Sequence, residues 1–149
     1  MAVPPPGFTE GLWRLTTALR PRTTDFWLYY APRNGGGPHQ LRVCDRTGYD
    51  FGRLTWRSCA ECHRGHIMKI RVTDDWQRQG YGTRMMLRAM RGGESYAWTT
   101  TPQFEDGQRF FPALSATVGT GFPVASACAH AARGGGYARP RLEGPPETS

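Results

Sequence analysis

A glycine-rich turn is the part of this chain whose residue types and spacing point most directly to chemistry. It runs Gln77-Arg78-Gln79-Gly80-Tyr81-Gly82-Thr83. An apolar, strand-like run precedes it at residues 66–72, and a helix-like run follows at residues 83–91. This arrangement presents backbone N–H groups and the positive end of a helix dipole to an anion. It predicts a phosphate-binding loop, and the alternative is a tight turn that has no ligand.

The spacing in this turn also resembles a family signature. Gln77-x-x-Gly80-x-Gly82 is similar to the R/Q-x-x-G-x-G/A signature of the GNAT acetyltransferases. The run from Val72 to Gln77 resembles the strand end and short turn that precede that signature. The resemblance implies that the loop binds the pyrophosphate of acetyl-coenzyme A and that the preceding strand binds the pantetheine arm. The residues implied to bind the cofactor are Ile70, Arg71, Val72, Gln77, Arg78, Gln79, Gly80, Tyr81, Gly82 and Thr83.

The same resemblance implies an N-acetyltransferase in which an amine attacks the acetyl thioester directly. A backbone N–H of the strand would stabilise the oxyanion, and holding both reactants in place would supply much of the rate. The Gln77 side chain is expected to brace the loop. Many members carry a tyrosine that protonates the leaving thiolate, but the matching residues here are Phe110 and Phe111. The catalytic residues therefore stay unassigned, and the resemblance supports cofactor binding better than it supports catalysis.

Cysteine and histidine residues form two pairs that are far apart in the sequence. The first is Cys59-x-x-Cys62 and the second is Cys128-x-His130. Together they offer three sulfur ligands and one nitrogen ligand for a tetrahedral zinc ion. Such a site would hold the C-terminal segment against the loop before the strand at residues 66–72. The alternative is that these residues are unconnected thiols and an imidazole on separate loops.

Hydrophobic periodicity predicts the elements that must position these residues. Helices are expected at residues 8–19, at residues 83–91 and from Asp106, a suitable N-cap, to residue 114. Alternating or aromatic runs predict strands at residues 24–31, 40–44, 49–56, 66–72 and 95–101. The fold class is therefore α+β. The order of elements resembles the GNAT fold, a mixed, mainly antiparallel sheet flanked by helices.

Length and composition bound the domain organisation. The 149 residues suffice for one domain with its own core, and the 19 glycines and 12 prolines suggest flexible ends. We expect a disordered lead at residues 1–7, a GNAT-like domain at residues 8–132 and a disordered tail at residues 133–149. No apolar segment approaches the roughly 20 residues of a membrane span, and the N-terminus has no secretory pattern. A cytoplasmic location is expected, where cysteines stay thiols or bind metal.

The net charge of +7 suits two kinds of anionic partner, a cofactor or a nucleic acid. No basic run is long enough for a nucleic-acid tail, so a nucleic-acid partner is disfavoured. The leading hypothesis is an N-acetyltransferase that uses acetyl-coenzyme A and an amine of a small molecule or protein, as a monomer or a homodimer. One alternative is an acyl-coenzyme A sensor or interaction module, which Phe111 favours. Another is a zinc-stabilised nucleic-acid-binding domain.

Overall fold

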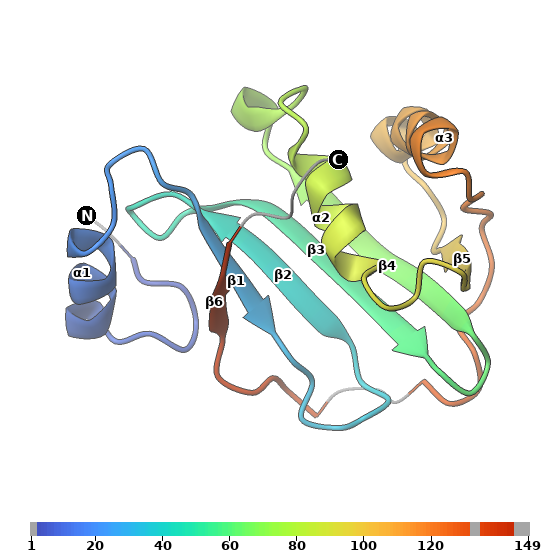
Figure 1. The fold of residues 1–149 in the computed structure, drawn as a ribbon, viewed down its shortest axis with the longest axis horizontal. Coiled ribbons are helices and arrows are strands. Elements are labelled where there is room, and N and C mark those ends of the chain that lie inside the picture. Colours follow the sequence, from blue (N-terminus) through green and yellow to red (C-terminus); the bar gives the residue numbers. More distant parts are fainter. Residues whose placement is uncertain (1–2, 132–134, 145–149) are drawn as a thin grey trace.

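A single mixed sheet organises the computed structural model, which describes residues 3–131 and 135–144. The strand order is β5-β4-β3-β2-β1-β6, and every neighbouring pair is antiparallel except the parallel pair β4 and β5. The elements are α1 (Glu10–Ala18), β1 (Phe26–Tyr30), β2 (His39–Cys44), β3 (Asp50–Cys59), β4 (Arg64–Val72), the 3-10 turn η1 (Asp74–Trp76), α2 (Tyr81–Ala89), β5 (Ala97–Thr100), α3 (Glu105–Val118) and β6 (Arg141–Glu143). This confirms the predicted α+β class with a mainly antiparallel sheet flanked by helices (Figure 1).

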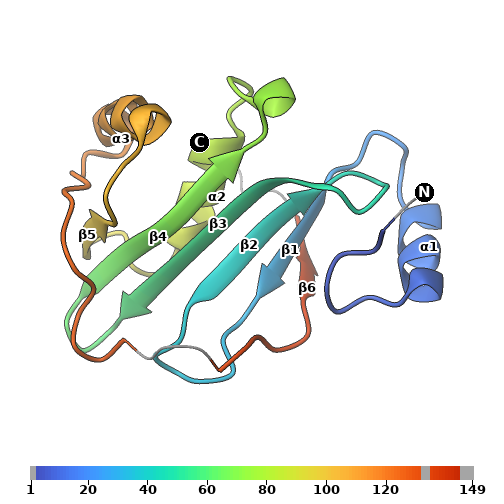
Figure 2. The same cartoon turned by 180° about the vertical axis from the view of Figure 1, so that it is seen from behind.

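Alternation along the strands builds a separate apolar core on each face of the sheet, because successive strand side chains point to opposite faces. On one face, residues such as Leu41, Leu54 and Ile67 pack with Met85 and Met86 of α2. The second core lies on the other face and contains Trp13, Phe26, Leu28, Tyr30 and Cys44. Figures 1 and 2 show α2 across one face, with α1 beside the sheet edge formed by β1 and β6.

The third helix differs from its predicted start. Its N-cap position is Phe104, so Asp106 lies inside the first turn and the N-cap assignment was wrong. Asp106 and its neighbour Glu105 still place negative charge where the helix dipole favours it. The helix continues past the predicted end at residue 114 to Val118, and Gly119 ends it with a left-handed backbone, φ 75°. None of the described helices is long and apolar enough to cross a membrane.

Both described ends of the chain contact the sheet. The Val3 N–H donates to the Thr47 carbonyl at 3.0 Å. The Tyr30 hydroxyl donates to the Pro6 carbonyl at 2.7 Å. Near the other end, β6 pairs with the edge of β1. These contacts differ from the disordered lead and tail that composition suggested. The tail contact forms because the edge of β1 offers backbone groups that β6 pairs, whereas the lead is held by single hydrogen bonds. The remaining residues of those two segments, 1–2, 133–134 and 145–149, lie outside the described residues.

Candidate functional site

The glycine-rich turn follows η1, which comes after the end of β4, and it leads into the first turn of α2 (Figure 1). Gly80 is the N-cap residue of α2 and has a left-handed backbone, φ 83°, as does Arg78 with φ 64°. Glycine adopts this conformation without the steric cost that a Cβ brings. No side chain caps α2, and the first N–H groups of a helix have no partner inside it. The turn therefore leaves backbone donors at the positive end of α2.

Hydrogen bonds inside the turn hold its shape. Gln77 Nε2 donates to the Val72 carbonyl at 3.0 Å and to Asp74 Oδ1 at 3.2 Å. The Gln77 side chain thus ties the turn to the end of β4, which is the bracing role expected for it. Residues 77–80 are exposed, and the first turn of α2 contains no acidic residue that would offset its dipole.

Two of the predicted cofactor residues, Tyr81 and Gly82, lie on the side of α2 that faces the protein interior. The Tyr81 ring packs edge-on against Phe51 with centroids 5.0 Å apart, and its hydroxyl donates to Asp25 Oδ2 at 2.5 Å. Burial and the Asp25 hydrogen bond raise the pKa of Tyr81. A Cβ on Gly82 would lie 2.9 Å from the Phe110 ring of α3. Tyr81 and Gly82 therefore position α2, and only their backbone groups remain for a ligand.

Strand β4 extends beyond its parallel partner. β5 pairs with β4 as far as Ile67 and Thr100. Thr101 then donates its N–H to the Ile67 carbonyl at 3.0 Å and its hydroxyl to the Met68 carbonyl at 2.9 Å. Within the described chain, residues 69–72 of β4 have no partner in β5. The predicted cofactor residues Ile70, Arg71 and Val72 all lie in this stretch, which pairs with β3 along its other edge.

The side chain of Arg71 is engaged on the sheet face opposite α2. Its guanidinium lies 3.3 Å from Asp50 Oδ1 and donates to the Asp50 carbonyl at 3.0 Å. Arg42 and Arg53 bind the other oxygen of the same carboxylate. Three arginines from three neighbouring strands therefore share one acid. Arg71 can offer a cofactor its backbone, while its guanidinium is committed to Asp50.

Helix α3 contains no tyrosine, and it carries Phe110 and Phe111, the residues matched above to the GNAT tyrosine motif. Phe111 is 4% exposed and packs against Phe122 with ring centroids 5.4 Å apart. Tyr96 lies just before β5, near the start of β4 where the parallel pairing begins, and its ring stacks on His63. The part of β4 that pairs with β5 therefore lies between Tyr96 and residues 69–72. Neither position supplies an acid beside residues 69–72.

The Cys59–Cys62 pair and the Cys128–His130 pair come together at the opposite end of β4 from the glycine-rich turn. Cys59 is the last residue of β3, Cys62 lies in the turn before β4, and Cys128 and His130 follow a segment beside β5. One ligand atom from each of these residues lies within 4.8 Å of the others. His130 Nδ1 is 3.6 Å from Cys59 Sγ and 3.2 Å from Cys62 Sγ. The fold thus gathers all four candidate metal ligands, which would otherwise be unconnected groups.

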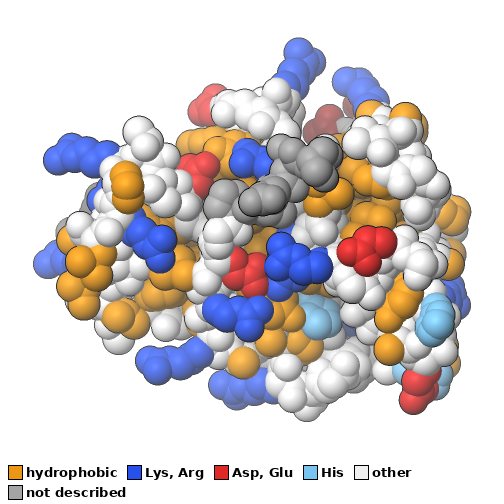
Figure 3. All heavy atoms as spheres, viewed as in Figure 1, with side chains coloured by type: hydrophobic (Ala, Val, Ile, Leu, Met, Phe, Trp, Pro, Cys, Tyr) orange, Lys and Arg blue, Asp and Glu red, His pale blue; other side chains and the backbone are white. Residues whose placement is uncertain are grey.

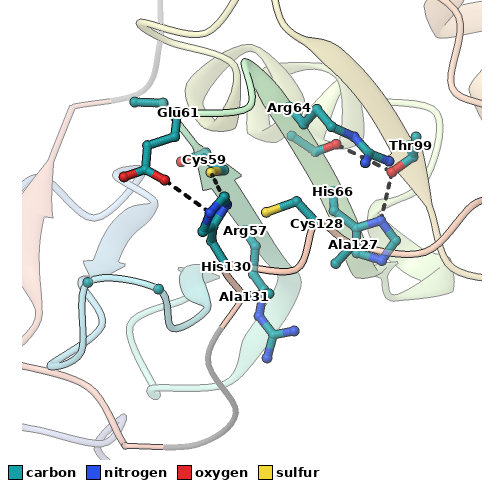
Figure 4. Close-up of a pocket in the computed structure, with 15 residues that line it drawn as sticks. Arg57, Cys59, Glu61, Arg64, His66, Thr99, Ala127, Cys128, His130 and Ala131 are labelled. Carbon is teal, nitrogen blue, oxygen red and sulfur yellow. Dashed lines mark hydrogen bonds and ion pairs between the residues drawn. The ribbon is translucent and has the colours of Figure 1, made fainter.

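A hollow of about 260 Å³ adjoins this cluster (Figure 4). Cys59, Cys128 and His130 line it together with the buried pair of His66 and Thr99, whose side chains are hydrogen-bonded at 2.8 Å. The backbone N–H of Cys62 lowers the pKa of the Cys59 thiol to about 7, and hydrogen bonds from the surrounding thiols and imidazole act in the same direction. The hollow therefore belongs to the cysteine–histidine end of the molecule and not to the glycine-rich turn.

Sequence reasoning missed one participant in this cluster. Glu61 Oε2 lies 3.1 Å from His130 Nε2, on the side of the imidazole away from the sulfurs (Figure 4). The position of Glu61 between the two cysteines of the first pair is a local signal that it would follow the hairpin turn. Its contact with a histidine 69 residues away depends on the fold.

Comparison with known proteins identifies few similarities. No protein-family model matches the chain, and no curated protein matches it. Among solved structures, the crystal structure of Tetrahymena GCN5 is similar over 39% of this chain and 36% of that one, with 19% identity and a TM-score of 0.34. The chain thus spans about a third of the length of the structure it matches. A likeness of this extent establishes neither a family nor an activity.

Proposed function

We propose that the chain binds acetyl-coenzyme A along β4 and the glycine-rich turn and transfers its acetyl group to an amine. One observation carries the proposal: residues 69–72 of β4, which have no partner in β5, lead through η1 into the turn that exposes the N-terminus of α2. An acyl-coenzyme A has a pyrophosphate joined to an arm that contains amide groups. Such a ligand requires an anion site continuous with a strand edge, and this end of β4 offers both.

The turn supplies the anion-binding half of this site. The N–H groups that open α2 have no intrahelical partners, and they carry the positive end of the helix dipole. Arg78 is exposed within the turn. The Arg84 guanidinium lies over the Tyr81 ring, 4.6 Å from its centroid, and so adds a second positive charge to the first turn of the helix. These groups together match the charge of a pyrophosphate.

The unpaired edge of β4 supplies the other half. Strand edges bind extended ligands through backbone N–H and C=O groups, and the pantetheine arm has amides of the same kind. The thioester would then lie near Met68 and Thr101, where β5 ends its pairing with β4. A backbone N–H of β4 would stabilise the oxyanion formed when the amine attacks.

The proposed reaction depends on positioning more than on side-chain chemistry. Two reactants held in a productive orientation gain a large effective concentration without any acid or base. Because Phe111 has no proton to donate, water carries the proton in this proposal: the attacking amine releases a proton to water as the amide forms, and the leaving thiolate takes a proton from water. The same phenylalanine favours a second candidate function, a module that binds acyl-coenzyme A and does not turn it over.

Calorimetric titration of acetyl-coenzyme A into the purified chain tests the binding step. We expect measurable heat and a raised melting temperature. The absence of both effects at millimolar ligand would refute the binding proposal. Free-thiol release with a panel of primary amines then separates the two candidates. Binding with amine-dependent release supports the transferase, whereas binding without release supports the sensor module.

A nucleic-acid-binding function is supported less well by the surface. In the view of Figure 3, basic side chains are spread among acidic and apolar ones over the face that carries α2. A continuous basic stripe is the usual footprint of backbone binding to a duplex. On the opposite face, the arginine row of β2, β3 and β4 is partly neutralised by Asp50.

A further inference from the structure

We infer that Cys59, Cys62, Cys128 and His130 bind one zinc ion, and that Glu61 holds the His130 imidazole in its ligating orientation. The inference is independent of the proposed acyltransferase function. It rests on four residues from two distant segments, on the orientation of one imidazole ring, and on what the site would connect.

The ligand atoms lie close to the spacing of a tetrahedral centre. With Zn–S bonds of about 2.3 Å and a Zn–N bond of about 2.0–2.1 Å, neighbouring ligand atoms of a tetrahedral site are about 3.5–3.8 Å apart. The distances from His130 Nδ1 to the sulfurs of Cys59 and Cys62 are 3.6 and 3.2 Å, and all four ligand atoms lie within 4.8 Å of one another. In Figure 4 the Cys128 sulfur points toward Cys59 and His130, while Arg57 points away from the cluster.

The His130 ring has the orientation that a metal ligand needs. Its Nδ1 atom faces the sulfurs, and its Nε2 atom lies 3.1 Å from Glu61 Oε2. A histidine that ligates zinc commonly donates its other N–H to a carboxylate, which fixes the tautomer and makes the ligating nitrogen more basic. With Nε2–H directed at Glu61, the Nδ1 lone pair is directed at the sulfurs. Glu61 is therefore a positioning residue and not a ligand.

The chemistry of the donors selects the metal and the role. Three thiolates and one imidazole in tetrahedral array favour zinc over the hard cations Mg²⁺ and Ca²⁺, which prefer oxygen ligands. Four protein ligands leave no open position for water or substrate, which is the pattern of a structural zinc site. The site also lies at the far end of β4 from the glycine-rich turn. We therefore assign the ion to folding and not to catalysis.

The ion would fasten the segment that follows α3. Thr100 of β5 donates its N–H to the Pro123 carbonyl at 2.9 Å and accepts from the Ala125 N–H at 3.0 Å. Arg64 at the start of β4 donates to the Ser126 carbonyl at 3.3 Å. These few bonds hold residues 122–126 beside β5, and Cys128 and His130 follow at once. Zinc would join this segment to the β3–β4 turn, so its binding free energy would become folding free energy.

Metal binding to the full-length chain tests the inference. We expect one zinc per chain by elemental analysis after purification under reducing conditions with zinc supplied. Replacing zinc with cobalt(II) should produce the thiolate charge-transfer and d–d absorption of a tetrahedral site. Less than about a tenth of an equivalent of zinc, an octahedral cobalt spectrum, or a disulfide between Cys59 and Cys62 would each overturn it.

Matched variants test the individual residues. Cys128→Ser and His130→Ala should each weaken zinc binding at least 100-fold in competition with a chromophoric chelator. Glu61→Gln should weaken it by 10- to 100-fold, the range seen when a carboxylate partner of a ligating histidine is lost. His63→Ala is the control, because His63 adjoins Cys62 in sequence but stacks on Tyr96 outside the cluster. Equal affinity in His130→Ala and His63→Ala would overturn the ligand set.

Loss of folding in His130→Ala would leave its affinity unmeasured, and His130→Cys then decides. A fourth thiolate should retain the ion and shift the cobalt charge-transfer band toward that of a four-sulfur site. A spectrum unchanged by His130→Cys would show that residue 130 is outside the coordination sphere.

Discussion

Arg88 of α2 and Glu143 of β6 are joined by two hydrogen bonds, which attach β6 to the helix that follows the glycine-rich turn. Arg88 Nε lies 2.5 Å from Glu143 Oε2, and Arg88 Nη2 lies 2.8 Å from Glu143 Oε1. The two side chains are only 11% and 12% exposed. A bidentate pair at this depth is screened far less by solvent than a surface ion pair. The last described strand is therefore attached to α2 as well as to β1.

Replacing Glu143 with glutamine tests this attachment. We expect Glu143→Gln to lower the free energy of unfolding by about 2 kcal/mol, because Arg88 would lose a charged bidentate partner at a largely buried position. Urea unfolding followed by tryptophan fluorescence measures the change. Glu10→Gln is the control, since Glu10 pairs with Arg14 on an exposed helix surface, and its loss should cost no more than about 0.5 kcal/mol. Equal costs in the two variants would contradict the role assigned to Glu143.

The same pair predicts a pH dependence of stability. Burial alone would raise the pKa of Glu143, but hydrogen bonds from Arg88 and Arg141 outweigh it and leave the pKa below its usual value. A carboxyl whose pKa is lower in the folded state contributes stability above its unfolded pKa of about 4.3, and this contribution is lost as pH falls through the folded value. The stability difference between wild type and Glu143→Gln should thus shrink below about pH 4. A difference that grows on acidification would contradict this sign.

Gly80 and Gly119 form a matched pair for testing the glycine-rich turn. Both have a left-handed backbone, with φ of 83° and 75°, and a Cβ at either position would meet no atom within 4 Å. Alanine at each should cost about 1–2 kcal/mol of stability for the same conformational reason. Only Gly80→Ala should also weaken acetyl-coenzyme A binding, by at least 10-fold in calorimetry, because it distorts the N-terminus of α2. Similar affinities in both variants would remove the turn from the binding site.

Gly82 permits a close contact between α2 and α3. Alanine at this position would place Cβ 2.9 Å from the Phe110 ring, so we expect Gly82→Ala to cost about 1–3 kcal/mol despite its better helix propensity. Adding Phe110→Ala should recover part of that loss, because the clashing ring is gone. A double-mutant cycle from chemical unfolding measures the coupling between the two sites. Additive costs would mean that the two helices adjust independently.

Removing the metal should loosen one defined part of the protein. We expect a strong chelator to lower the melting temperature of the zinc-loaded chain by at least about 5 °C, a shift of the size produced by a few kcal/mol in a domain of this length. Hydrogen exchange should quicken at the Ala125 amide, which donates to Thr100, and stay unchanged in the middle of α2. His63→Ala should show the same response to the chelator as wild type. Uniform loss of protection over the whole chain would contradict a local role.

Much of the architecture could be predicted from local sequence patterns. The strand periodicity of residues 66–72, the glycines at 80 and 82 and the amphipathic run after them specify a strand, a turn and a helix through interactions within a few residues. Helix α3 shows the limit of such patterns. Its start was misplaced by two residues because Asp106 is a favourable N-cap by type, yet the extended backbone at Phe104 sets the cap.

The sequence alone determined which residues could do chemistry, because residue type and short spacing specify a donor set or a flexible turn. Only the tertiary structure decided which of them meet. It directed Tyr81 toward Asp25, and it paired β6 with β1 although composition suggested disorder. It also brought His130 to Cys62 across 68 residues and placed Glu61 behind the imidazole. Such contacts depend on how the fold brings distant segments of the chain together, and a local sequence pattern does not specify which distant segments meet.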